Sequence, residues 1–384
     1  MIDENRILKT LNDLSFPRLS GTVFEKECFN KVKGKVEELN ISPEFQEFSF
    51  SIFYSRIYPR LALTLLSWLL FIFFLNLDLI FNLINIVLIL ISILFLIKIT
   101  RNPEKIRIGK KYYSQNLYIK IPSKSKENSS ENNIFLFSHL DSKGQKFPIK
   151  IRIRLYHGWV ITFPLGLLII IINTYYLRGF SLLLYIFEIL LLSINIIVII
   201  LLWLNITDNR SPGAIDNATG ISCVLELLHF YSNPKNKLLN YNIWFVFTGA
   251  EESGTMGVRN FYQIIKYLDR EKSYIVNFDS IATHAYLWDH GLLNNKYYKS
   301  FNYILENKEK LTLIKKTHRF YIGTYSDGLF LMNKKFNGLG NGDKSYYNYI
   351  HSENDNIEKI DIKVLKTLCQ FYTILFNEVD INQK

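Results

Sequence analysis

Three apolar runs of the chain end at carboxylate or imidazole side chains that could do metal chemistry. The runs cover residues 133–141, 242–252 and 274–279. The side chains at their ends are those of His139 and Asp141, of Glu251 and Glu252, and of Asp279. Imidazole and carboxylate groups bind Zn²⁺ and similar ions, and adjacent glutamates can divide the work of ligand and general base. The pattern therefore favours a divalent-metal site.

The three runs must be positioned by elements that bring their ends together. They are short and rich in Ile, Val and Phe, which is typical of buried strands in a largely parallel sheet. In open α/β sheets, ligands bind beyond the carboxyl ends of the strands. A polar residue at one such end is also an ordinary strand cap, but three such ends in one chain favour a common site.

Further candidate ligands lie in loops. Segment 211–220 is rich in Gly and Pro and carries Asp216 just before a predicted helix over 221–231. His351 is followed by Asp355, which we expect to cap a helix that begins two residues later. Two histidines and several carboxylates, without thiolates, suit Zn²⁺ with an open position for water. One carboxylate can bridge two metals about 3.5–4 Å apart, an arrangement that activates water and polarises a carbonyl.

In this order the motifs resemble those of the two-zinc aminopeptidase family that includes bacterial leucyl aminopeptidase and aminopeptidase Y. Glutaminyl cyclase and glutamate carboxypeptidase are relatives of that family. The resemblance covers almost all of the soluble sequence and includes an opening segment, Phe16-Pro-Arg-Leu-Ser-Gly-Thr. It implies an α/β fold with a mostly parallel, mixed central sheet and helices on both faces. The motifs are His139-x-Asp141, Asp216-Asn217, Thr248-Gly-Ala-Glu251-Glu252, Asn277-Phe-Asp279 and His351-Ser-x-x-Asp355.

The resemblance implies two Zn²⁺ or similar ions and a ligand set. Asp216 would bridge the ions, and the peptide bond that follows it would be cis. His139 and Asp279 would complete one site, whereas Glu252 and His351 would complete the other.

The resemblance also implies catalytic roles. Glu251 would be the general base for a metal-activated water, and Asp141 would orient His139, with a simple turn residue as the alternative reading of Asp141. Two departures from the family stand out. Ile215 occupies a position where the family often has a second acid, and the carbonyl-polarising tyrosine of some members has no clear counterpart. Tyr325 is the nearest candidate, and we take it as a substrate-binding residue.

Two almost uncharged regions predict membrane insertion. A bilayer core of about 30 Å needs around 20 apolar residues as a helix. Amphipathic periodicity is absent from both regions, which disfavours buried helices of a soluble protein. Glu188 lies in the last span, where functional and packing roles stay open. Breaks at residues 76–78 and 178–179 predict two hairpins, 59–97 and 156–204, with four spans over 61–75, 79–97, 158–177 and 180–204.

Without the hairpins the chain leaves three soluble pieces, 1–58, 98–155 and 205–384. Because each hairpin returns the chain to the side it left, we expect one discontinuous zinc peptidase domain in one compartment. Residues 1–58 are charged throughout, so we expect no signal peptide. Basic residues flank the spans on the side of these pieces, whereas the opposite turns offer only Arg178, which predicts a cytoplasmic domain of a multi-pass protein. These residues are Arg56, Arg60, Lys98, Arg101, Lys146, Lys150, Arg152, Arg154 and Arg210.

Charge and cysteine content exclude other classes. The net charge is +11, but the basic residues are scattered and form no stripe with aromatic residues, so we expect no nucleic-acid partner. The cysteines, Cys28, Cys223 and Cys369, are far apart and odd in number, so they predict no disulfide framework. The oligomeric state does not follow from the sequence.

The function that we expect is a membrane-anchored zinc-dependent exopeptidase, an aminopeptidase that acts on peptides. A glutaminyl-cyclase-like acyltransferase is the first alternative, although those relatives typically use one zinc. A catalytically inactive membrane scaffold of the same fold is the second, but it would have lost ligands. A transporter has little support, because the spans contain one acidic residue and no evident repeat.

Overall fold

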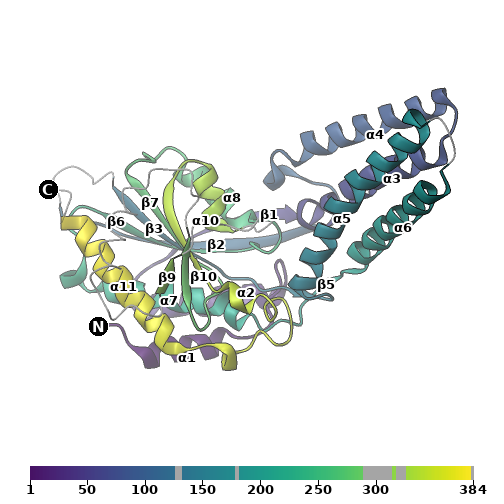
Figure 1. Cartoon of the computed structure of the whole chain (residues 1–384). Helices are drawn as coiled ribbons and strands as arrows, with labels where there is room; N and C mark the ends of the chain where they lie inside the picture. Colours follow the sequence, from purple (N-terminus) through teal and green to yellow (C-terminus); the bar gives the residue numbers. More distant parts are fainter. Residues whose placement is uncertain (126–131, 178–180, 289–313, 317–325, 382–384) are drawn as a thin grey trace. The chain divides into compact units, whose positions relative to one another are not determined.

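The computed structural model describes residues 1–125, 132–177, 181–288, 314–316 and 326–381. The chain divides into two compact units (Figure 1). The sheet unit comprises residues 1–50, 112–144 and 208–384, and the helical unit comprises residues 51–111 and 145–207. The chain leaves one unit and enters the other at residues 50–51, 111–112, 144–145 and 207–208. These positions lie outside the uncharged runs, because the helical unit also includes the charged residues that flank those runs.

The sheet unit is built on a mixed eight-stranded sheet in the order β1-β2-β6-β3-β7-β10-β8-β9. The four central strands, β6, β3, β7 and β10, run parallel, whereas β2 and β8 are antiparallel to their neighbours β6 and β10. The expected fold class is therefore confirmed. The strands are β1 (Glu44–Ser51), β2 (Lys111–Ile121), β3 (Asn133–His139), β6 (Asn242–Thr248), β7 (Ser273–Phe278), β8 (Ala285–Trp288), β9 (Ile314–Lys316) and β10 (Asn337–Gly342).

Helices cover both faces of this sheet because its strands are apolar on both sides. In β3, Ile134 and Leu136 join one hydrophobic cluster, and the alternating Phe135 and Phe137 join another. The first cluster takes residues from α1 (Glu4–Leu14), α2 (Val23–Glu37), α7 (Thr219–Ser232) and α11 (Ile362–Ile381). The second takes residues from α8 (Met256–Ile265) and α10 (Asp327–Asn333).

The register of the central strands brings the polar ends together. His139 pairs with Thr248 across β3 and β6, and Phe137 pairs with Asn277 across β3 and β7. If the second ladder is continued by two residues, His139 lies opposite Asp279. The three chemical ends therefore share one edge of the sheet, as the parallel arrangement predicts.

The helical unit contains four helices that are long and apolar enough to cross a membrane. They run as two antiparallel pairs (Figure 1). α5 contains Pro164, and a π-helical turn, η3 (Ile172–Tyr176), continues it. The charged residues at the start of α5 are helical, so this helix begins well before the uncharged run. The helices are α3 (Tyr58–Leu75), α4 (Leu79–Thr100), α5 (Ile149–Ile171) and α6 (Leu182–Leu204).

Polar side chains join three of these helices inside the helical unit. Ser67 of α3 donates a hydrogen bond to Asn195 of α6 at 2.5 Å and accepts one from Trp159 of α5 at 2.9 Å. Asn195 in turn donates to Thr162 of α5 at 3.2 Å. In an apolar surrounding such bonds specify which helix faces meet.

Glu188 of α6 is buried in the same unit and accepts a hydrogen bond from Asn173 of η3 at 3.0 Å. This contact gives Glu188 a packing partner, and we assign it no chemistry.

Candidate metal centre

The first group of candidate ligands joins the ends of two strands to the loop before α7. His139 ends β3, Asp279 follows β7, and Asp216 precedes the helix. His139 Nε2 lies 3.0 Å from Asp216 Oδ1 and 3.6 Å from Asp279 Oδ1. The structure therefore brings these three side chains together, although 63 residues separate the two aspartates in sequence, 279 − 216.

The second group shares Asp216 with the first. His351 Nε2 lies 3.3 Å from Asp216 Oδ2 and 2.7 Å from Glu252 Oε1. Glu252 follows β6, and His351 lies in the segment between β10 and α11. Asp216 thus directs Oδ1 to one group and Oδ2 to the other, which is the arrangement of a bridging carboxylate.

Both groups fit a divalent ion such as Zn²⁺. In a tetrahedral zinc site with bonds of about 2.0–2.1 Å, neighbouring ligand atoms lie about 3.3 Å apart. The measured separations of 2.7–3.6 Å bracket that value. Asp216 Oδ1 and Glu252 Oε1 are also buried without a hydrogen-bond partner among the described residues. Buried carboxylate oxygens of this kind need a compensating partner, and a cation supplies one.

Asp141 connects the strand that carries His139 to the pair of glutamates. Its Oδ1 and Oδ2 accept the backbone N–H groups of Glu251 and Glu252, each at 3.0 Å, and Oδ2 also accepts the Ser20 hydroxyl at 2.5 Å. His139 Nδ1 lies 3.0 Å from the backbone oxygen of Asp141 and 3.5 Å from its carboxylate. The carboxylate thus positions mainly the Glu251–Glu252 turn, and the backbone oxygen is the nearer partner of the imidazole.

The loop before α7 is held by Asn217. The peptide bond between Asp216 and Asn217 is cis, as the resemblance implies. The Asn217 amide donates to the Phe278 carbonyl at 2.8 Å, and its oxygen accepts the Gly220 N–H at 3.1 Å. These bonds attach the loop that carries Asp216 to the end of β7 and to the first turn of α7.

Arg18 braces the same region from the amino-terminal segment. Its side chain is fully buried, and its guanidinium donates to the carbonyls of Leu140 at 2.7 Å, Pro212 at 2.7 Å and Gly213 at 2.8 Å. Leu140 adjoins His139, and the two other carbonyls belong to the loop that leads to Asp216. One cation therefore fixes both ligand-bearing segments through their backbones.

Asp355 has a different role from the helix cap that the sequence suggests. Its carboxylate accepts the Ile215 N–H at 2.6 Å and the Ser211 hydroxyl at 3.3 Å, whereas Asn356 stands at the cap position of the next helical turn. Asp355 therefore orders the loop that carries the bridging carboxylate. The expectation of a cap was wrong because the two hydrogen-bond donors lie far away in sequence.

Burial and neighbouring charges separate the pKa values of the two glutamates. Burial raises the pKa of Glu251 well above its usual value, and the nearby Glu252 adds to this effect. Burial also acts on Glu252, but the charges of His351 and Lys143 outweigh it and lower the pKa of Glu252 to about 2. A base with a raised pKa beside a permanently ionised ligand suits the division of work predicted for this pair.

The Asp216 carboxylate and the His139 imidazole perturb one another. Burial opposes ionisation of Asp216, but the adjacent imidazoles of His139 and His351 lower its pKa. Burial acts against a charged His139, but hydrogen bonding to Asp141, Asp216 and Asp279 raises its pKa well above the usual value. A positive charge is therefore favoured in the middle of this carboxylate cluster.

Three non-glycine residues in or beside the two ligand groups have positive φ angles, which residues other than glycine rarely adopt. Ala250 has φ of 52°, Ser280 has 59° and His351 has 63°. Ala250 precedes Glu251, and Ser280 follows Asp279. Positive φ values at non-glycine residues cost energy and concentrate at functional sites.

Sequence reasoning missed two further charged residues of the site. Lys143 Nζ lies 2.5 Å from Glu252 Oε2. Asp327, at the start of α10, is buried and accepts the hydroxyl of Thr248, and burial raises its pKa to about 7. Lys143 lies two residues beyond the motif His139-x-Asp141, and this proximity was the only feature of the sequence that could have indicated its place in the site. Asp327 lies in the segment that drew attention for Tyr325.

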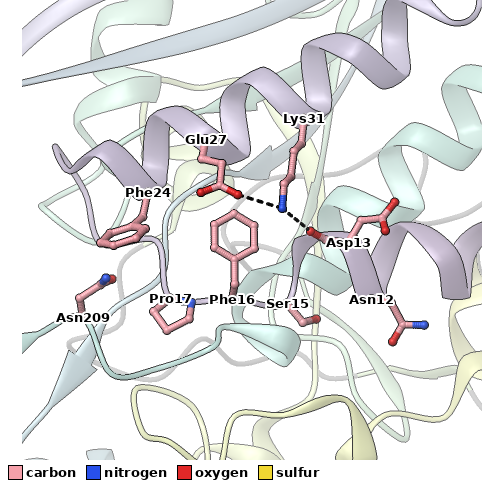
Figure 2. Close-up of a pocket in the computed structure, with 9 residues that line it drawn as sticks. All are labelled: Asn12, Asp13, Ser15, Phe16, Pro17, Phe24, Glu27, Lys31 and Asn209. Atoms are coloured by element: carbon pink, nitrogen blue, oxygen red, sulfur yellow. Dashed lines mark hydrogen bonds and ion pairs between the residues drawn. The ribbon is translucent and has the colours of Figure 1, made fainter.

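Other candidates lie elsewhere. Tyr325 is outside the described residues, so its expected substrate contact stays a prediction. A cavity of about 500 Å³ lies between α1, α2, the segment that joins them and Asn209. Figure 2 shows its lining residues. Lys31 Nζ there lies 3.0 Å from Glu27, donates to the Asp13 carbonyl and packs over the Phe16 ring. No predicted ligand is among its lining residues, so we assign this cavity no chemistry.

Comparisons with known proteins identify a matching family and a shared fold. The model of the family described as Peptidase family M28 matches residues 197–372. A comparison with curated proteins found no match. The family match and the structural neighbours below confirm the resemblance to the zinc aminopeptidase family, and at family level they support a zinc-dependent peptide hydrolase.

Several solved structures share the fold. An aminopeptidase from Aneurinibacillus sp. strain AM-1 aligns with a TM-score of 0.58 and 12% identity over 98% of this chain and 93% of its own. A zinc aminopeptidase from Bacillus subtilis gives 0.58 and 13% over 99% and 96%. A glutaminyl cyclase from Macrostomum lignano gives 0.53 and 11% over 99% and 90%. At these identities the neighbours establish the fold.

Proposed function

We propose that the chain is a membrane-anchored zinc-dependent exopeptidase, specifically an aminopeptidase that removes amino-terminal residues from peptides. The observation that carries this proposal is the pair of ligand groups joined by the two oxygens of Asp216, with Glu251 beside them. His139, Asp216 and Asp279 would hold one ion, and Asp216, Glu252 and His351 would hold the other. Ions held there would supply Lewis acidity, which lowers the pKa of water and polarises a peptide carbonyl.

The residues of the chain supply the rest of the chemistry. Glu251 is buried just beyond β6, and its raised pKa makes it a stronger proton acceptor than an ordinary glutamate. It takes a proton from the attacking water and returns that proton to the leaving amine when the peptide bond breaks. The Asp141 carboxylate accepts the backbone N–H of Glu251 and so keeps Glu251 in place.

A test of the proposed function uses the purified full chain in detergent. Aminoacyl reporter substrates should be hydrolysed, the same substrates with an acetylated amino group should not, and a chelator should abolish the activity. Turnover of the blocked substrates alone would exclude an aminopeptidase. Cyclisation of amino-terminal glutaminyl peptides without hydrolysis would favour the second candidate, a glutaminyl-cyclase-like acyltransferase, which the Macrostomum lignano neighbour supports.

The four apolar helices support the proposed membrane anchorage. We place the catalytic residues on the cytoplasmic side, because basic residues flank the spans on the side of the soluble pieces. Protease treatment of sealed vesicles tests this placement. In right-side-out vesicles, which enclose the cytoplasmic face, protection of the sheet unit from protease supports the placement. Cleavage of the sheet unit in those vesicles contradicts it.

A further inference from the structure

The ammonium group of Lys143 forms an ion pair with one carboxylate oxygen of the candidate ligand Glu252. Lys143 Nζ lies 2.5 Å from Glu252 Oε2, and its side chain is 11% exposed. Glu252 Oε1 faces the other way, 2.7 Å from His351 Nε2. The two oxygens of this carboxylate are thus divided between a lysine and the ion position, which leaves one oxygen for an ion.

In the described residues, the other ligand group has no such lysine or arginine beside it. Asp279 Oδ1 accepts the Ser280 hydroxyl at 3.0 Å and faces His139. Within the part of the chain that the structure describes, no lysine or arginine forms an ion pair with Asp279, and Asp216 pairs only with the two histidines. Among the described residues, a lysine or arginine therefore stands beside one of the two groups and not beside the other.

We propose that Lys143 is a positioning residue that makes the two ion positions unequal. This inference rests on the proposed function and deepens it. Lys143 restricts Glu252 to coordination through a single oxygen. Its charge also repels a cation bound by Asp216, Glu252 and His351, so that this position has the lower affinity. The position formed by His139, Asp216 and Asp279 fills first.

Lys143 affects the affinity of the second ion position in two opposite ways. It orients Glu252, which strengthens binding, and it repels a cation, which weakens binding. Outer partners that orient a ligand are worth roughly 10–100-fold in metal affinity. Repulsion between a lysine and a divalent ion at about 5 Å, in a partly buried site, exceeds that contribution at an effective dielectric constant near 20. Removal of the charge with retention of a hydrogen-bond donor should therefore strengthen the weaker position.

The experiment titrates Zn²⁺ into chelator-treated full-length protein by calorimetry. The wild type should bind two ions in two resolved steps. Lys143→Gln should strengthen the second step by at least about tenfold, and by more than the first, whereas Lys143→Arg should resemble the wild type. Glu252→Gln should remove the weak step, and Asp279→Asn the strong one. Lys35→Gln is the matched control, because Lys35 forms an ion pair of 2.6 Å with Asp13 and contacts no candidate ligand.

The outcomes separate this inference from the proposed function. A first step in Lys143→Gln that is at least as tight as in the wild type shows that the variant is folded. If its second step then stays within about twofold of the wild type, or weakens, the role of Lys143 is refuted while the two-ion site stands. Equal affinities in the wild type would refute it as well. If the wild type binds no ion, the proposed function falls together with the inference.

Discussion

Asp141 and Glu251 are 110 residues apart in sequence, yet the Asp141 carboxylate accepts the Glu251 backbone N–H at 3.0 Å. The same carboxylate accepts the next N–H, that of Glu252, and belongs to the residue whose backbone oxygen faces His139. One side chain therefore couples the ends of β3 and β6. A displacement of either strand would move both a candidate ligand and the proposed general base, so the geometry of the candidate site depends directly on the register of the sheet.

Glu251→Gln should abolish turnover and retain the metal. Positioned general bases contribute about 10²–10⁴-fold, and the amide keeps the size of the side chain but cannot accept the proton. Reporter hydrolysis and elemental analysis of the same preparation check both parts. Glu252→Gln is the matched comparison, since it should lose bound metal. A Glu251→Gln protein that keeps wild-type activity, or that loses its metal, would show that the role is wrongly assigned.

Asp216→Ala should lose most of both ions, because its two oxygens face different ligand groups. Elemental analysis should approach two equivalents per chain for the wild type and fall well below one for the variant. Asp13→Ala, which alters an exposed carboxylate away from the site, should keep the wild-type content. Loss of a single equivalent from Asp216→Ala would contradict the bridging role.

Arg18→Met should destabilise the sheet unit. The change leaves several buried carbonyls without their donor, and each unsatisfied group costs about 1–3 kcal/mol, so we expect a loss of at least about 3 kcal/mol. Urea unfolding in detergent measures the difference. Arg270→Met, at a part-buried site with one long hydrogen bond to Tyr262, should change stability by less than about 0.5 kcal/mol. Equal effects of the two variants would exclude a bracing role for Arg18.

Metal binding should release protons and weaken as the pH falls. Burial opposes a charged His139, but three aspartates raise the pKa of this histidine well above its usual value, and only the neutral imidazole binds an ion. A proton must therefore leave near neutral pH, and affinity should drop roughly tenfold per pH unit for each proton released. Calorimetry in buffers with different protonation enthalpies counts these protons. Heats that do not depend on the buffer would contradict the prediction.

Asn195→Leu should weaken the packing of the helical unit. The change removes hydrogen bonds to Ser67 and Thr162, and such bonds in membrane proteins contribute about 0.6–1.7 kcal/mol each. The thermal midpoint in detergent should fall. Ser92→Ala is the control, because among the described residues the Ser92 hydroxyl bonds only to the Leu88 carbonyl of its own helix. A midpoint equal to that of the control would show that the network contributes nothing.

Local patterns in the sequence determined the class of fold, the ligand types and the four apolar helices. Strand ends and span lengths depend on residues that are neighbours in the chain, so periodicity and composition are enough to predict them. The polar ends of three apolar runs indicated a common site because parallel strands end at one edge of a sheet. The boundaries of the helices were less well predicted, since α5 continues into charged residues that a hydropathy pattern excludes.

Tertiary structure alone decided which groups support the ligands. Arg18 reaches Gly213 over 195 residues, Asp355 reaches Ile215 over 140, and Lys143 reaches Glu252 over 109. No periodic pattern in the sequence predicts these contacts, because each depends on how distant segments meet at the end of the sheet. The division of the Asp216 and Glu252 oxygens between partners is likewise a matter of side-chain geometry. Sequence therefore indicated the ligands, whereas packing determined what holds them and how unequal their surroundings are.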